Sequence, residues 1–406
     1  MVSKEHTVRR TVESVARDSY GRLIAYLASR TRDVASAEDA LSDALVSALT
    51  TWPRDGIPGN PHAWLLTAAR NRLVDQARRR QVRAESEPTL ELLASRDLDT
   101  SEIEAIPDER LRLLFVCAHP AIDPDMHTPL MLQTVLGLDA TQIGRAFLVS
   151  SQTMSQRLVR AKTKIRRAGI AFEIPPTRDL PERLDAVLNA IYAAYGSGWE
   201  DAAGVDPRAR GLAEEAIWLG RALSVLMPHE PEVLGLLALM FHCEARRSAR
   251  RGADGDYIPL TEQDTSQWDA ALVAEAERLL ASAATFSRIG RFQIEAAIQS
   301  VHAERVRTGQ TDWTVIDVFH AQLVQLSPTL GARIAHAASH AEVAGAAAGL
   351  AMLDALDQGS TKSYQPYWAV RAHLLERLGR DASEALDRAI GLTEDDAVRR
   401  FLLRLS

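Results

Sequence analysis

Apolar residues recur at intervals of three and four along almost the whole chain, the spacing that places them on one face of an α-helix. No convincing β-branched run with alternating polarity appears, so we expect an all-α protein. The first predicted helix spans about 11–29, and the second begins at Ser36 as its N-cap. The third runs from Asn60-Pro61 to about Arg80. Between the second and third helices, Pro53–Gly59 is rich in turn-forming residues and predicts a loop.

A second helical group follows an acidic stretch. Residues 84–109 contain nine acidic residues and one basic residue, Arg96, which indicates a linker. The helical pattern resumes at Leu111. Thr128-Pro129 opens a helix that Gly137 closes, and helices over 139–147 and 151–167 follow with a short turn between them. So short a connection predicts a helix-turn-helix.

The remainder of the chain, from about Asp179, is a series of amphipathic helices. Turn-forming residues interrupt the pattern near Pro228, 252–259, Gly290, Pro328 and Gly359. Stacked helical hairpins, a solenoid, fit this pattern best, and 367–392 resembles a tetratricopeptide unit. The predicted domains are therefore 1–83, an acidic linker over 84–110, a helix-turn-helix domain over 111–174, and a helical domain over 179–406.

Composition excludes several classes of protein. Cys117 and Cys243 are too few and too far apart for a disulfide framework, so we expect a cytoplasmic protein. The most apolar stretch, 343–353, is shorter than the roughly 18 to 20 residues that a spanning helix needs, so we expect no membrane segment. Up to Ala171 the chain has 24 basic against 21 acidic residues, and after it 23 against 33. The two halves thus differ in electrostatic character.

The third predicted helix ends in a basic cluster. Arginine pairs well with phosphates, and Trp64 in the same helix could stack on an unpaired base. A solvated basic face with a core tryptophan would give the same pattern. The cluster comprises Arg70, Arg72, Arg78, Arg79, Arg80 and Arg83.

The helix over 151–167 has the pattern of a recognition helix. An apolar stripe formed by Met154, Leu158, Ala161 and Ile165 would pack inward, which leaves polar residues exposed at the helix start to meet base edges. Basic residues would then hold phosphates at its other end, although a basic helix of an RNA-binding protein would look alike. These basic residues are Arg157, Arg160, Lys162, Lys164, Arg166 and Arg167.

Two groups of motifs occur in a recognisable order. Residues 36–41 (SAEDAL), Trp52-Pro53, 60–72 (NPHAWLLTAARNR) and Asp75 resemble sigma region two, and 140–144 (ATQIG) with 153–161 (TMSQRLVRA) resembles region four. Together they resemble the extracytoplasmic-function class of bacterial sigma factors. Because two independent modules agree, the resemblance is specific.

The resemblance implies partners and site residues. Core RNA polymerase would be bound through three acids expected to be exposed, Glu38, Asp39 and Asp43. The minus-ten promoter element would be held by Arg54, Asp55, Asn60, Trp64, Arg70, Asn71, Arg78 and Arg79. The minus-thirty-five element would be read by Ser151, Gln152, Ser155, Gln156, Arg157, Arg160 and Lys164.

The long tail resembles that of a subgroup of this class with a tetratricopeptide-like C-terminal extension. Residues 108–113, 146–149, 231–240, 263–264 and 268–269 carry this resemblance, whereas 195–199, Thr265 and 336–344 depart from it. We expect the tail to regulate the sigma core in cis, and a protein or peptide could bind it.

The sequence gives no basis for an enzyme. No nucleophile elbow, phosphate loop or paired-histidine metal motif is recognised, so we expect no catalytic residue, metal or cofactor. Two other functions stay open. A conventional helix-turn-helix transcriptional regulator with a tetratricopeptide-like sensor domain would leave 52–71 unexplained, and a pure adaptor would leave both basic clusters unexplained.

Overall fold

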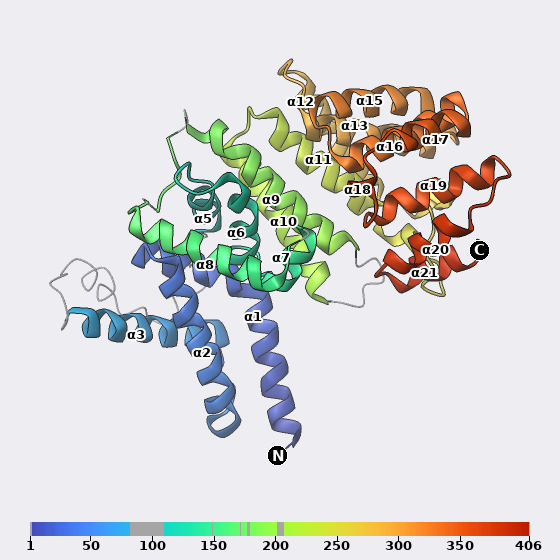
Figure 1. The fold of residues 1–406 in the computed structure, drawn as a ribbon. Helices are drawn as coiled ribbons and strands as arrows, with labels where there is room; N and C mark the ends of the chain where they lie inside the picture. The colour runs from blue at the N-terminus through green and yellow to red at the C-terminus, as the bar shows by residue number, and fades with distance from the viewer. Residues whose placement is uncertain are drawn as a thin grey trace. The chain divides into compact units, whose positions relative to one another are not determined.

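The chain is helical in the computed structural model, which describes residues 2–81, 109–147, 149–170, 172–176, 179–200 and 207–405 (Figure 1). Within these ranges the regular structure is α-helix and short 3-10 helix, with a single isolated bridge between Arg251 and Tyr257. The expected all-α fold is confirmed. The predicted linker over 84–110 lies outside the described residues except for Glu109 and Arg110.

The chain divides into two compact units. The first lies within Met1–Gly196 and Gly211–Leu219, and the second within Ser197–Arg210 and Gly220–Ser406. Helices α9 (Leu180–Glu200) and α10 (Pro207–Leu226) contribute residues to both units.

The first unit begins with three mutually packed helices, α1 (Val2–Thr31), α2 (Val34–Asp55) and α3 (Pro61–Gln81). The expected cap of α3 is confirmed, because the Asn60 side chain accepts the N–H of Ala63 at 3.1 Å. The expected cap of α2 is wrong. Asp33 is the N-cap and accepts the N–H of Ser36, whose hydroxyl also donates to the Asp33 carboxylate.

Helix α2 also extends further than expected. It continues through Pro53 for two more residues, so Arg54 and Asp55 lie in its last turn and not in a loop. Proline removes one N–H and leaves the carbonyl four residues earlier without its helical donor. The helix then ends at Gly56, whose φ of 90° is readily adopted only by glycine and whose N–H donates to the carbonyl of Trp52.

Five further helical segments complete most of the first unit: α5 (Arg110–Cys117), η2 (Pro124–Met126), α6 (His127–Thr134), α7 (Ala140–Ala146) and α8 (Ser151–Arg167). Asp139 and Gln142 form a capping box at the start of α7, and Ser150 caps α8. The turn passes close over Gly144, where a Cβ would come within 2.6 Å of the carbonyl oxygen of Val149. The positions predicted for α7 and α8 are confirmed.

In the second unit, consecutive helices pack on one another along the chain. Helix α11 contacts α12 and α13, and the contacts continue from α13 to α15, α16, α17, α19, α20 and α21 (Figure 1). The expected breaks are confirmed except that Gly359 lies inside a short helix, α18. The α-helices are α11 (Pro231–Ala245), α12 (Ala270–Ala284), α13 (Arg291–Ala303), α14 (Arg305–Thr308), α15 (Trp313–Leu326), α16 (Leu330–Ala344), α17 (Ala346–Asp354), α18 (Gln358–Thr361), α19 (Gln365–Arg377), α20 (Ser383–Leu392) and α21 (Asp396–Leu403). The 3-10 helices are η4 (Arg247–Arg250), η5 (Leu260–Glu262) and η6 (Thr265–Gln267).

Small residues let the helices of this unit approach closely. A Cβ on Gly235 of α11 would come within 2.7 Å of the backbone nitrogen of Gln293 on α13. A Cβ on Gly349 of α17 would come within 2.5 Å of the carbonyl oxygen of Ala337 on α16. Apolar side chains such as Ile334, Leu353 and Leu374 fill the space beside that crossing.

Candidate nucleic-acid and polymerase interface

The start of α3 and the end of α2 bring two tryptophans together. The rings of Trp52 and Trp64 meet edge to face with centroids 5.4 Å apart. Trp52 is buried, whereas Trp64 is half-buried. Trp64 therefore packs on the buried Trp52 and still leaves part of its side chain accessible to solvent.

The residues expected to hold the minus-ten element lie around this pair and along α3. Asn60, Trp64 and Arg70 are half-buried, and the Arg79 side chain lies outside the described part of the chain. Arg54 is held locally, since its Nε donates to the carbonyl of Thr50 at 3.3 Å. The exposed members are Arg54, Asp55, Asn71 and Arg78.

Helix α8 presents all of the residues expected to read the second promoter element. Met154, Leu158, Ala161 and Ile165 are buried, as the apolar stripe predicts. The opposite face leaves polar side chains at the first two turns and basic side chains further along. The exposed residues are Ser151, Gln152, Ser155, Gln156, Arg157, Arg160 and Lys164.

The three acids expected to bind polymerase differ in exposure. Asp39 and Asp43 are exposed on α2. The expected exposure of Glu38 is wrong, because its carboxylate pairs with the ammonium of Lys162 on α8 and its side chain is 13% exposed. Lys162 also donates to the side-chain oxygen of Gln133 at 2.9 Å and is itself buried, so it is not among the exposed cations of α8.

Two ion pairs join α2 to α8, and the first is the pair of Glu38 with Lys162. Burial raises the pKa of the Glu38 carboxyl, and the neighbouring Lys162 opposes that rise. A second pair joins Arg166 to Asp33, the cap of α2, at 3.4 Å. Sequence reasoning missed both pairs because the partners are more than 120 residues apart and no local pattern connects them.

Helices α9 and α10 supply further partners to α5 within the first unit. The Arg110 guanidinium pairs with Glu215 and lies 4.0 Å from the centroid of the Trp218 ring. Arg183 donates to the carbonyl of Phe115 at 3.2 Å. On α5, Cys117 is buried, and burial raises the pKa of its thiol to about 12, so it is not a reactive thiolate.

Comparison with known proteins identifies the three-helix part of the first unit. The family described as Sigma-70 region 2 matches residues 15–83, from within α1 past the end of α3. The chain belongs to the sigma-70 family. This sigma factor is 39% identical to an uncharacterized protein of Rhizobium meliloti (strain 1021) over 392 residues, 94% of this chain and 91% of the other, so the two belong to one family.

A second match lies outside the sigma region. Residues 183–284 of this sigma factor match a family described as of unknown function (DUF6596), which extends from α9 to the end of α12. No solved structure matches the chain significantly. Among the described helices of this sigma factor, none is long and apolar enough to cross a membrane.

Proposed function

We propose that this protein is an alternative sigma factor of the extracytoplasmic-function class, whose C-terminal unit regulates its activity in cis. It binds core RNA polymerase, recognises two promoter elements and helps to open the DNA, while the polymerase supplies the chemistry. The observation that carries the proposal is the match of 15–83 to sigma-70 region 2, which a conventional DNA-binding regulator would not need.

Region two would open the promoter at the junction of α2 and α3. A base that leaves the duplex must recover its lost stacking and hydrogen bonds from the protein. The half-buried ring of Trp64, the 56–60 loop and the exposed Arg54 offer such contacts together. Asn71 and Arg78 lie further along the same helix, where they would hold the melted strand.

Region four would read the second element with α8. The turn between α7 and α8 fixes the start of α8, and its exposed serine and glutamine side chains can both donate and accept hydrogen bonds at base edges. Arg157, Arg160 and Lys164 would contact phosphates on either side. Base contacts from the helix start, combined with phosphate contacts from basic residues, are typical of a recognition helix in the major groove.

Docking on core polymerase would use the exposed acids of α2. Reversing both charges in the variant Asp39→Lys/Asp43→Lys is expected to weaken binding to sigma-free core polymerase at least about 30-fold, from roughly 1–2 kcal/mol per reversed contact. Fluorescence anisotropy of the labelled full chain with core polymerase measures this affinity. Both residues are exposed, so the fold is expected to survive.

The matched control reverses two exposed acids of α20, in the variant Glu384→Lys/Asp387→Lys. It changes the net charge by the same amount and is expected to leave the affinity for core polymerase unchanged. Equal weakening by both variants would mean that overall charge, and not the α2 surface, governs binding.

Regulation in cis is supported by charge. The sigma core carries exposed basic residues on α3 and α8, whereas the chain after Ala171 has 23 basic against 33 acidic residues. An acidic helical array covalently tied to basic DNA-binding helices is suited to influence their access to DNA.

Removal of the C-terminal part tests this regulation. The truncated chain must keep the residues of α9 and α10 that contact α5. A chain that ends at Arg178 lacks Glu215, Trp218 and Arg183, which contact α5 in the first unit. A chain that ends at Leu226 keeps all three. We expect its promoter-dependent transcription to differ at least about tenfold from that of the full chain, a coupling of about 1.4 kcal/mol. Equal transcription from the two chains would contradict regulation in cis.

A further inference from the structure

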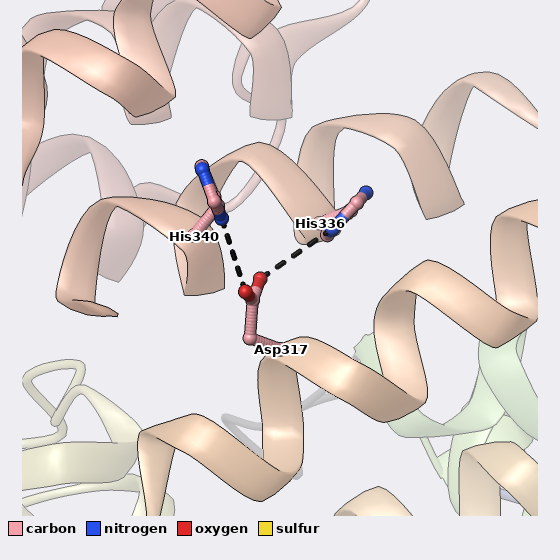
Figure 2. Close-up of side chains that lie close together, drawn as sticks. All are labelled: Asp317, His336 and His340. Atoms are coloured by element: carbon pink, nitrogen blue, oxygen red, sulfur yellow. Dashed lines mark hydrogen bonds and ion pairs between the residues drawn. The ribbon is translucent and has the colours of Figure 1, made fainter. Parts of the chain in front are cut away.

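Three side chains of the second unit converge between α15 and α16. Asp317 on α15 points between His336 and His340 of α16 (Figure 2). One carboxylate oxygen of Asp317 lies 3.5 Å from Nε2 of His336, and the other lies 3.0 Å from Nδ1 of His340. One potential ligand atom from each residue lies within 4.8 Å of the others.

The spacing suits a metal ion with tetrahedral geometry. The two histidines are four positions apart, so both lie on one face of α16, opposite α15. Zinc bonds of 2.0–2.1 Å place neighbouring ligand atoms about 3.3 Å apart in a tetrahedron. The two separations involve different oxygens of Asp317, and each is close to this value. One potential ligand atom from each residue lies within 4.8 Å of the others, so side-chain rotations would bring three atoms around one ion.

A buried hydroxyl orients the carboxylate. Ser339 is 1% exposed, and its Oγ lies 3.2 Å from Oδ1 of Asp317 and 3.0 Å from Nδ1 of His320. The same Oγ also lies 3.0 Å from the carbonyl oxygen of His336, so its single proton can be donated either to that carbonyl or to Asp317. Metal ligands are commonly held by such outer hydrogen bonds.

The cluster is sheltered and also reachable from solvent. The side chains of Asp317 and His336 are 16% and 19% exposed, and that of His340 is 34% exposed. An ion can therefore enter past His340 and be held against the two more buried ligands.

We propose that Asp317, His336 and His340 form a site for a divalent transition-metal ion, with zinc as the best fit to two imidazoles and one carboxylate. Calcium and magnesium prefer all-oxygen sites and fit poorly. The fourth position of the ion stays open for water or an external ligand. No metal was expected from the sequence because no metal motif was recognised in it. The spacing of His336 and His340 was the missed signal, and only the packing of α15 on α16 brings Asp317 beside them.

The test uses the full chain without a histidine tag, treated with chelator and titrated with zinc chloride by calorimetry. We expect one zinc per chain at this site. Asp317→Asn, His336→Gln and His340→Gln should each weaken binding at least about tenfold. The control His373→Gln removes an exposed histidine of α19 and should leave binding unchanged. Equal affinity in the wild type and all three site variants would overturn the proposal.

Cobalt(II) gives a second readout that needs no variant. The unaltered chain should bind cobalt with the intense visible absorption of a four-coordinate ion, and added zinc should remove that absorption. Magnesium at the same concentration should not compete. A cobalt complex with only the weak absorption of six-coordinate ions would contradict the site, whatever the folding of the variants.

Discussion

Reversing two charges on α8, in the variant Arg157→Glu/Arg160→Glu, is expected to reduce promoter-dependent transcription at least about 30-fold while binding to core polymerase stays unchanged. A hydrogen bond to a charged group contributes about 1.5–3 kcal/mol, so loss of two phosphate contacts costs more than about 2 kcal/mol, and the new acids also repel phosphate. Both side chains are exposed and lie outside the buried stripe of the helix. Transcription from a fixed promoter template, with core affinity measured in parallel, separates the two effects.

The matched control reverses two exposed arginines of the second unit, Arg333 and Arg380. This variant, Arg333→Glu/Arg380→Glu, carries the same net charge and should transcribe like the unaltered chain if α8 is the surface that reads DNA. Normal transcription by the α8 variant would contradict the role proposed for region four. Loss of core binding by that variant would instead place α8 on the polymerase.

Replacing Lys162 by alanine is expected to lower the free energy of unfolding of the first unit by about 3 kcal/mol at pH 8. Lys162 and Glu38 have side chains that are 9% and 13% exposed, and removing one partner of such a pair leaves a buried charge without compensation. Gln133 would also lose its donor. Denaturant unfolding of the full chain, monitored by tryptophan fluorescence, measures the change.

The pH dependence of this loss gives an independent check. Burial already raises the pKa of Glu38, and the variant also lacks the ammonium that opposes the rise. A carboxyl whose folded pKa exceeds its unfolded value favours the folded state at low pH, and that contribution is lost as pH rises through the folded pKa. The destabilisation by Lys162→Ala should therefore be smaller at pH 5 than at pH 8.

A double variant separates lost charge pairing from lost packing. In Glu38→Leu/Lys162→Met, apolar side chains of similar size replace both partners, and such replacements are often neutral or stabilising. We expect this variant to recover most of the stability. A loss below about 0.5 kcal/mol for Lys162→Ala alone, the scale of an exposed pair, would mean that the contact between α2 and α8 is weak in solution.

This pairing bears on how the sigma core would engage polymerase. Asp39 and Asp43 are available on the surface of α2, whereas Glu38 is held by α8. If Glu38 also contacts polymerase, α8 must first leave α2. Sigma regions two and four would then separate on docking, and the free energy of the Glu38–Lys162 pair would oppose that step.

Local features of the fold could be predicted from the sequence, because caps and apolar spacing act within one or two turns. The bounds of α8 and the Asn60 cap of α3 are examples. The end of α2 was misplaced because a proline near a helix end does not always stop the helix, and Gly56 sets the end instead.

Interactions between distant residues could not be predicted in the same way. The burial of Glu38 depends on Lys162, 124 positions away, and the cluster around Asp317 depends on the packing of α15 on α16. Exposure of the α8 residues followed from its apolar stripe alone. Their roles toward DNA, like those of the α3 residues, rest on the family and stay predictions.

Start-site mapping tests the central claim most directly. Sigma-free core polymerase is mixed with the purified chain and genomic DNA fragments, and the transcripts that depend on the chain are sequenced from their starts. The chain ending at Leu226 is assayed in parallel. A sigma factor of this class predicts starts that share a pair of upstream elements at fixed spacing, from at least one of the two chains. Absence of dependent starts from both chains, when core polymerase is bound, would contradict the account.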